Sequence, residues 1–350
     1  MIMVENALEK LSDRRQNNFN LIRLLAAIGV IITHSYAVLG QPESDLLAKA
    51  TNGILSFSRL GVYVFFIISG FLIAQSLERS KTIVSFYWKR FLRIFPALVV
   101  AIVVTVFVLG SIMTTLSLSD YFKNPGTYRY LGGMTLYRIT YKLPGVFADN
   151  LRPNTVNGSL WTLPYEWTCY VVLSFFVFLI KKKKKAVFLL FFFLVLIVRI
   201  TWGDHLSDKI IPILYLNALH MINYSLFFFS GVLSFVFKDH LRFSPWYALI
   251  GVVIIYLGSR SFWGIYALYC ILAYLVLYLA IVRMPLKKFF LERDYSYGMY
   301  IFVFPIQQVL SQFFSTSLNV ASLALLAIIC TAPLAVLSWH FVEKPALKLK

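Results

Sequence analysis

Long apolar runs recur from one end of this 350-residue chain to the other, and they constrain its fold more than any other feature. A run of about 20 apolar residues is long enough for a helix to cross a bilayer. Because lipid offers the backbone no hydrogen-bond partners, such runs must satisfy their polar groups internally, as helices do. With 59% hydrophobic and 14% charged residues, the chain is too apolar for a soluble domain. The sequence therefore predicts an all-α, polytopic integral membrane protein.

Hydropathy predicts about ten transmembrane helices. Residues 1–17 form a charged cytoplasmic lead, residues 18–345 form the transmembrane domain, and residues 346–350 form a cytoplasmic tail. The longest connection, residues 117–162, is rich in Tyr, Gly, Asn and Pro, which favours an ordered extracytoplasmic loop or a re-entrant lid. The predicted spans are 18–40, 57–78, 94–116, 163–180, 186–203, 222–237, 244–258, 262–282, 297–314 and 320–342.

The net charge of +18 is mostly an orientation signal. If the N-terminus is cytoplasmic, 22 of the 33 Lys and Arg residues fall on the inner side, including the run "KKKKK" at 181–185, and 9 fall on the outer side. Arg23 and Arg199 lie within spans. Cytoplasmic loops of membrane proteins carry such an excess of cations. Both termini are therefore predicted to be cytoplasmic, and no nucleic-acid partner is expected.

The first span contains the stretch "RLLAAIGVIITH", which begins with Arg23 and ends with His34. Eleven helical steps rotate by about 1100° and rise by about 16 Å, so both side chains lie on one face of the helix. Each has an ordinary alternative: Arg23 could reach lipid phosphates, and His34 could be a hydrogen-bonded interior residue. Because the two face the same way, the pair indicates a site.

A second group of cations lies in "YWKRFLRIFP", where Arg90 and Arg93 are three residues apart and share a helix face. The excess of cations on the cytoplasmic side would by itself place basic residues here. The guanidinium groups at helical spacing also suit multidentate binding of phosphate oxygens.

Glu166, in "SLWTLPYEWTCY", is an acidic residue within a predicted span. A carboxylate inside a membrane is costly and is usually functional, although a buried structural partner is the alternative. If Glu166 approaches His34, it could orient the imidazole and raise its basicity, as carboxylates do for histidine general bases. Both residues are predicted to lie in the outer half of their spans.

Weaker signals are Ser69 in "FFIISGFLI" and Tyr297 and Tyr300 in "DYSYGMYIFVFP". Packing of small residues between helices and an interfacial aromatic belt are the ordinary readings of these segments. The three cysteines fall inside spans and predict no disulfide framework. The sequence has no HExxH motif, no Cys/His cluster and no Walker or GxSxG motif, so we expect no metal and no bound cofactor.

Several of these segments occur together in the order found in the membrane acyltransferase-3 family, which the chain resembles over nearly its whole length. Members of that family are ten-helix bacterial membrane proteins that O-acylate sugars of cell-surface polysaccharides, with acyl-coenzyme A (acyl-CoA) as the expected donor. The segments are the Arg, ten residues, His element at 23–34, "VYVFFIISGFLI" at 62–73, "FYWKRFLRIFP" at 86–96, "SLWTLPYEWTCY" at 159–170, "YSYGMYIFVFP" at 295–305 and "FVEKP" at 341–345.

The resemblance implies a role for each of the residues singled out above. It makes His34 the motif histidine, Arg23 its paired basic residue, Arg90 and Arg93 the Arg-x-x-Arg pair, and Glu166 the acidic residue of the fourth span. One departure is Val303, at a place where family members often carry a second histidine. The SGNH esterase-like domain that some members carry is not part of this chain.

These expectations combine into one mechanism at the inner membrane of a bacterium. Acetyl-CoA from the cytoplasm binds through its phosphates to Arg90, Arg93 and Arg23. His34 then acts as general base or as a transient acyl carrier, and a glycan acceptor meets the aromatic side chains from the outer side. Acceptor or pathway positions are Ser69, Trp161, Tyr165, Tyr297 and Tyr300. Two rivals remain. A lipid-linked-sugar flippase or transporter would use the same buried polar residues. A membrane polysaccharide polymerase would share the spans and the large outer loop, but it should need cations that face outward, whereas the paired arginines face inward.

Overall fold

We describe a computed structural model of the chain at residues 11, 13, 16–179, 184–284 and 293–350. The remaining residues lie outside the described part. Most of the predicted cytoplasmic lead and part of the "KKKKK" run lie among these residues.

A helix coincides with each of the ten predicted spans in the described part of the chain. Seven helical segments there are long and apolar enough to cross a membrane, and only one two-stranded sheet accompanies them. The prediction of an all-α, polytopic membrane protein is confirmed. The helices are α2 (Phe19–Val38), α4 (Phe57–Glu78), α5 (Ile83–Val104), α9 (Leu163–Leu179), α10 (Lys184–Trp202), α11 (Ala218–Val236), α12 (Pro245–Gly258), α13 (Gly264–Ile281), α15 (Ser296–Phe314) and α16 (Val320–Leu337).

The third span begins 11 residues earlier than the predicted residue 94, at Ile83. Thr82 caps this end of α5 by accepting a hydrogen bond from the backbone N–H of Ser85. Three cations near the start lower the local hydropathy, but Phe86 in the same turns is fully buried and anchors the helix. Because helices are held by one buried face and not by uniform apolarity, the hydropathy boundary was wrong here.

Both α5 and α16 continue through a π-helical segment. The first segment, η1 (Thr105–Leu109), leads into α6 (Gly110–Met113), and the second, η6 (Ser338–Glu343), leads into α17 (Lys344–Leu347). Each π-helical segment inserts extra residues into the helix and rotates the side chains that follow, and such segments often occur at functional sites. The second segment, η6, ends at Glu343, which belongs to the site described below.

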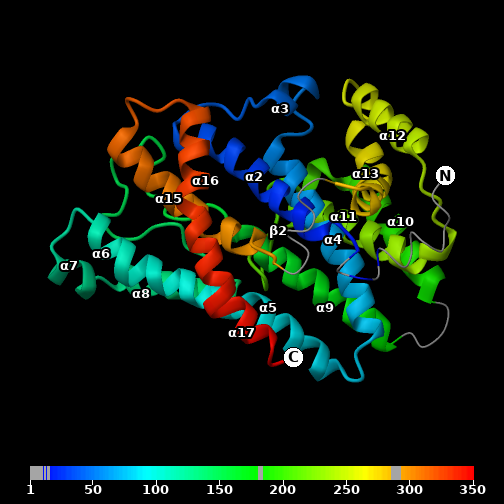
Figure 1. Cartoon of the computed structure of the whole chain (residues 1–350), viewed down its shortest axis with the longest axis horizontal. Helices are drawn as coiled ribbons and strands as arrows, with labels where there is room; N and C mark the ends of the chain where they lie inside the picture. Colours follow the sequence, from blue (N-terminus) through cyan, green and yellow to red (C-terminus); the bar gives the residue numbers. More distant parts are fainter. Residues whose placement is uncertain (1–10, 12, 14–15, 180–183, 285–292) are drawn as a thin grey trace.

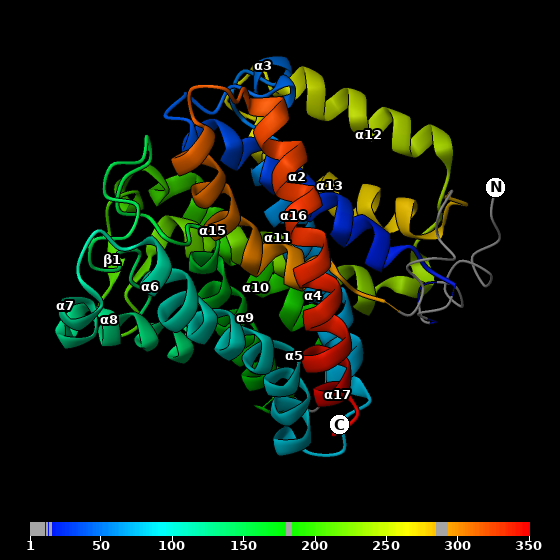
Figure 2. The same cartoon turned by 60° about the vertical axis from the view of Figure 1, so that its left-hand side comes forward.

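Helices α2 and α4 form the centre of the molecule in both views of the structure (Figures 1 and 2), with α15 and α16 on one side and α12 and α13 on the other. Helix α4 packs most extensively on α11 and on α2. The N-terminal parts of α2 and α5 and the C-terminal end of α4 line one cavity, so these three ends lie at the same end of the bundle.

Two glycines hold α4 and α11 in backbone contact. A Cβ atom on Gly70 of α4 would overlap the carbonyl oxygen of Phe228, and one on Gly231 of α11 would overlap the carbonyl oxygen of Ile67. Small residues at such crossings allow membrane helices to approach closely, which maximises van der Waals contact where lipid gives no hydrophobic driving force. The interpretation that small residues of this segment pack between helices is therefore correct for Gly70.

The connection 117–162 is ordered and is packed by its own side chains. It contains α7 (Leu118–Lys123), α8 (Pro125–Arg129) and the short 3-10 helices η2 (Tyr130–Thr135) and η3 (Leu160–Thr162). Its buried residues include Tyr121, Tyr130 and Phe147, and Thr114 and Val146 form an isolated antiparallel bridge. The remaining short elements are α3 (Leu46–Ala50), η4 (Asp204–Leu206), η5 (Lys238–His240) and the strands β1 (Ile210–Ile211) and β2 (Leu216–Asn217).

We expect Gly70→Ala to destabilise the protein by about 1 to 3 kcal/mol, because the added methyl group forces the backbones of α4 and α11 apart. Thermal unfolding of the purified protein in detergent measures the effect. Gly258→Ala is the matched control, since a Cβ atom there meets its neighbours only at ordinary contact distance, 3.5 Å or more. Equal unfolding temperatures for the two variants would contradict this account of the crossing.

Candidate active site

Two cavities lie at opposite ends of α2. The cavity that includes His34, near the C-terminal end of the helix, has a volume of about 850 Å³ and is called the His34 cavity. The cavity that includes Arg23, near the N-terminal end, has a volume of about 670 Å³ and is called the arginine cavity. Along a helix, the eleven steps from residue 23 to residue 34 rise about 16 Å. One helix therefore connects two separate binding-sized spaces.

His34 is half-buried in the wall of the His34 cavity. Its ring meets the ring of Phe304 edge to face, with centroids 5.3 Å apart. The Nδ1 atom is buried and has no hydrogen-bond partner among the described residues. An imidazole nitrogen without a partner costs free energy unless a ligand or water binds it. The alternative interpretation of His34, as a hydrogen-bonded interior residue, is therefore wrong for its Nδ1 atom.

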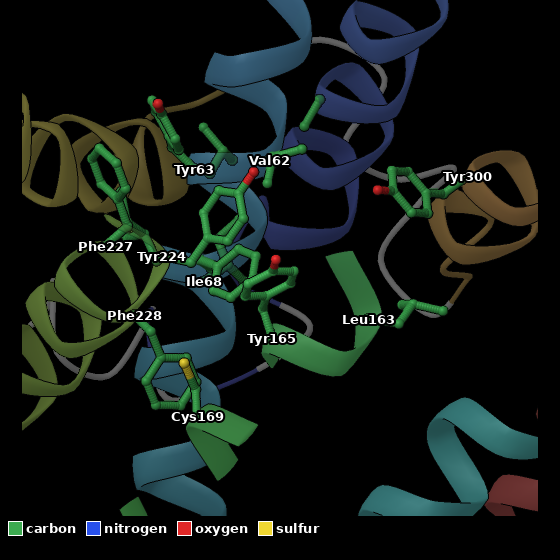
Figure 3. Close-up of a cluster of buried hydrophobic side chains, with 14 of the residues drawn as sticks. Val62, Tyr63, Ile68, Leu163, Tyr165, Cys169, Tyr224, Phe227, Phe228 and Tyr300 are labelled. Carbon is green, nitrogen blue, oxygen red and sulfur yellow. The ribbon is translucent and has the colours of Figure 1, made fainter. Parts of the chain in front are cut away.

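Aromatic side chains form one wall of the His34 cavity. Figure 3 shows Tyr165 of α9 beside Tyr224 of α11, and their ring centroids are 5.4 Å apart. The ring of Trp161 contacts both of these tyrosine rings. It also contacts the ring of His220, with centroids 5.0 Å apart. The hydroxyl oxygen of Tyr165 accepts a hydrogen bond from the backbone N–H of Asn217, which fixes its ring. The structure thus places Trp161 and Tyr165, two of the predicted pathway residues, in the wall of this cavity.

The arginine cavity brings together the three arginines that the sequence analysis singled out. Arg23 comes from α2, and Arg90 and Arg93 come from α5. Its lining among the described residues holds six basic side chains and two acidic ones. The basic residues are Arg23, Arg79, Lys89, Arg90, Arg93 and Lys350, and the acidic residues are Asp13 and Asp294.

Sequence reasoning missed the carboxylates that hold these arginines. Asp294 forms ion pairs with Arg23, at 2.6 Å, and with Arg93, at 2.5 Å. Arg93 also pairs with Glu343, at 3.2 Å. Arg23 is thus neutralised inside the protein, and the reading in which it reaches lipid phosphates is wrong. Both acids belong to or adjoin segments already noted, "DYSYGMY" and "FVEKP", but no local pattern identifies their partners.

Asp294 lies before α15, outside the membrane-spanning helix, and its side chain is 9% exposed. Burial raises the pKa of this carboxyl, but Arg23, Arg93 and the hydrogen bonds from Ser296 outweigh burial and lower its pKa from 3.8 to about 2. Asp294 is therefore ionised at any physiological pH. Because its pKa is lower in the folded state, the stabilisation is complete above pH 3.8 and is lost as the pH falls towards 2.

Glu166 lies near the arginine cavity, in small cavities that share Arg23 with it. It accepts short hydrogen bonds from the hydroxyl groups of Ser69 and Tyr170. It borders two small cavities of about 50 and 30 Å³, the first of which also includes Arg90 and Arg93, while both include Arg23 and Tyr297. Polar groups thus continue inward from the arginine cavity.

The predicted pairing of Glu166 with His34 is not among the contacts of the described residues, and Glu166 contacts Ser69 instead. The physical reason is the depth at which α9 begins. Ser69 is twelve residues into α4, about 18 Å along its axis from Phe57. The first turn of α9 contacts it there, so α9 starts deep within the bundle and its acidic residue faces the arginine end.

One stripe of α15 connects the two ends of the site. Tyr297 donates a hydrogen bond to the carbonyl oxygen of Ile94, at 2.9 Å. Tyr300, about one turn later, shares a hydrogen bond of 2.6 Å with Thr162. Phe304, about one further turn along, reaches the His34 cavity. Tyr297 borders both small cavities and Tyr300 borders the smaller one, and their place on a pathway stays a prediction.

Val303, at the place of the second histidine expected in similar proteins, is fully buried against Ala27 and Ile31 of α2. One turn later, Gln307 donates hydrogen bonds to the carbonyl oxygen of Ile31, at 2.9 Å, and to the hydroxyl of Ser35, at 2.8 Å. This face of α15 therefore supports the turn of α2 next to His34 through packing and an amide group, without an imidazole.

Comparisons with known proteins agree with this architecture. A family model described as an acyltransferase domain matches residues 16–340. The chain is 30% identical to an O-acetyl transferase of Shigella phage Sf6 over 334 residues, covering 94% of this chain and 96% of that protein. It is 29% identical to Nodulation protein 10 of Rhizobium leguminosarum bv. viciae over 373 residues, covering 97% of this chain and 95% of that protein. No solved structure matches the chain.

The helices, the two-ended site and these matches define a multi-pass membrane O-acyltransferase. The chain belongs to the acyltransferase-3 family, since the family model covers nearly all of it. Family membership thereby decides between the classes of protein left open by the sequence, in favour of acyl transfer over transport or polymerisation.

We expect Asp294→Asn to destabilise the protein by about 3 kcal/mol, because it removes the shared partner of two largely buried cations, whose side chains are 17% and 15% exposed. Thermal unfolding in detergent at pH 7 measures the loss. Asp204→Asn, at an exposed position, is the control. A double variant with Arg23→Gln should cost less than the sum of the single changes, and strict additivity would mean that the ion pair contributes little.

Proposed function

We propose that this protein transfers an acetyl group from cytoplasmic acetyl-CoA to a hydroxyl group of a cell-surface polysaccharide or lipid-linked glycan, across the inner membrane of a bacterium. The observation that carries this proposal is the position of the arginine cavity and the His34 cavity at opposite ends of α2. A charged donor and a sugar acceptor can then approach from different sides. Only the acetyl group has to pass between them.

The arginine cavity has the charge and size for the donor. Its lining has four more basic than acidic side chains, from six basic and two acidic residues. CoA carries several phosphate groups, and guanidinium groups bind phosphate oxygens through paired hydrogen bonds. Asp294 holds Arg23 and Arg93 in place, while Arg90, Arg79 and Lys89 lie around the rest of the cavity.

The acetyl end of the donor would extend past Glu166 and Ser69, along Tyr297 and Tyr300 of α15. The small cavities that these residues border support this route, and the long pantetheine arm of CoA would extend along it. Ser69, Tyr297 and Tyr300 are therefore pathway residues in this proposal. Glu166 positions the thioester by orienting the hydroxyl groups around it, and it does not act through His34.

His34 acts as the general base at the far end of this route. It takes the proton of the acceptor hydroxyl as the oxygen bonds to the thioester carbonyl carbon. The carbon–sulfur bond then breaks and the proton passes to sulfur, which leaves an O-acetyl ester and free CoA. The unpartnered Nδ1 atom of His34 supports this role. If His34 is instead a transient acyl carrier, a burst of thiol will precede addition of any acceptor.

The aromatic wall of the His34 cavity suits a sugar acceptor. Trp161 and Tyr165 present flat apolar surfaces, and polar groups of Asn217 and Asn223 line the same space. Acetyl as the transferred group agrees with the name of the phage relative, an O-acetyl transferase. The cytoplasmic position of both termini, predicted from the distribution of cations, places the arginine cavity on the side where acetyl-CoA is available.

We expect His34→Ala to lower acetyl transfer by about 10² to 10⁴-fold, the usual contribution of a general base. The purified protein or inverted membranes would be incubated with acetyl-CoA and native glycan, and free thiol and labelled glycan would be measured. His240→Ala, at an exposed position outside both cavities, is the control. Full activity of His34→Ala would remove His34 from the mechanism.

We expect Glu166→Gln to raise KM for acetyl-CoA while leaving the pH profile of kcat unchanged. The amide retains one oxygen that can accept from Ser69 or Tyr170, but it loses the charge that strengthens both bonds. Initial rates over a range of pH and donor concentration measure both quantities. A shift in the pH profile would instead mean that Glu166 tunes His34 directly, as the sequence analysis expected.

A further inference from the structure

Three arginines line the His34 cavity, and nothing in the proposed reaction requires them. Arg59 comes from the first turn of α4, Arg152 from the loop 117–162, and Arg199 from the last turn of α10. We propose that the acceptor glycan carries an anionic group, a carboxylate or a phosphate, that these arginines bind. This inference rests on the proposed function, in which the His34 cavity receives the acceptor.

The charge of this cavity has no explanation in membrane topology. The three arginines are accompanied by one acidic residue, Glu43, among the described lining residues. Arg59 is at the opposite end of α4 from Arg79, which lines the arginine cavity. Because the cytoplasmic excess of cations is expected at only one end of the bundle, it accounts for Arg79 but not for Arg59.

Arg199 gives the strongest indication of a ligand. It lies in α10, a helix largely exposed to lipid, and an arginine within such a span is costly and usually functional. Its Nε atom donates a hydrogen bond of 3.0 Å to Asn223, which also accepts one of 2.6 Å from Tyr269. Its guanidinium lies 5.7 Å from the ring centroid of Tyr266. These neutral partners hold the side chain without cancelling its charge.

The other two arginines extend the positive surface across the cavity. Arg59 donates hydrogen bonds to backbone carbonyl oxygens of Gly53 and Ile54, which fix the side chain but leave its charge uncompensated. Arg152 enters the cavity from the loop and lines it together with His34. Side chains from three separate elements thus meet in one space. Clefts lined by one sign of charge concentrate ligands of the opposite sign.

A binding experiment without acyl donor tests this inference separately from catalysis. The full chain in nanodiscs would be titrated calorimetrically with two pairs of probes. The first pair is an oligosaccharide that contains glucuronic acid and the same oligosaccharide with the carboxyl group reduced to a primary alcohol. The second pair is a polyprenyl-diphosphate-linked disaccharide and the corresponding neutral polyprenyl glycoside. The two pairs distinguish a sugar carboxylate from a lipid-linked phosphate.

We expect one anionic probe to bind at least about tenfold more tightly than its neutral counterpart, as charge-assisted hydrogen bonds usually provide. Arg199→Gln and Arg59→Gln should abolish that preference. Arg138→Gln is the control, since Arg138 is exposed in the same loop as Arg152 but lies outside the cavity. Arg59 is also exposed, so Arg59→Gln keeps the test valid if Arg199→Gln fails to fold.

Three results would overturn the inference: equal affinity within both pairs, no binding of either anionic probe, or unchanged preference in the arginine variants. Release of thiol from acetyl-CoA would be measured on the same preparations. If thiol release depends on His34 while the anionic preference is missing, only the inference fails. If thiol release is missing but anionic glycans bind through the arginines, the proposed transfer fails and the binding site remains.

Discussion

The ion pairs of Asp294 with Arg23 and Arg93 are the interaction on which the site depends. They connect the start of α2, the first half of α5 and the segment before α15, three elements far apart in the sequence. Glu343 adds the end of the last helix through Arg93. In a bilayer, where apolar packing between helices gains little over contact with lipid, these two carboxylates can hold four segments in one arrangement. The arginine cavity has a fixed shape because its own charges form this network.

The fold was largely predictable because it follows from one physical requirement. Each apolar run must be a helix, and a helix was found at all ten predicted spans in the described part of the chain. The exception was the start of α5, where Lys89, Arg90 and Arg93 masked a buried face. Hydropathy averages all sides of a helix, whereas packing acts on one side. Amphipathic ends of spans are therefore where such a prediction fails.

The sequence could predict only those parts of the site in which the residues lie on the same helix. Helical geometry was enough to place Arg23 and His34 on α2, and the same spacing argument paired Arg90 with Arg93. It could not supply Asp294, because an ion pair between residues 271 apart depends on how helices pack. The failed pairing of Glu166 with His34 has the same origin. The depth at which α9 begins is set by the loop before it, and sequence position within a span does not reveal that depth.

The backbone contact between α4 and α11 limits how this protein can move. Gly70 and Gly231 allow no sliding or separation of the two helices without loss of close packing on both sides. A transporter that alternates between two openings needs helices that rock against each other. Here the backbone contact between α4 and α11 resists such rocking, so the helix bundle keeps one arrangement. Its permeability barrier can stay intact at every stage of a catalytic cycle.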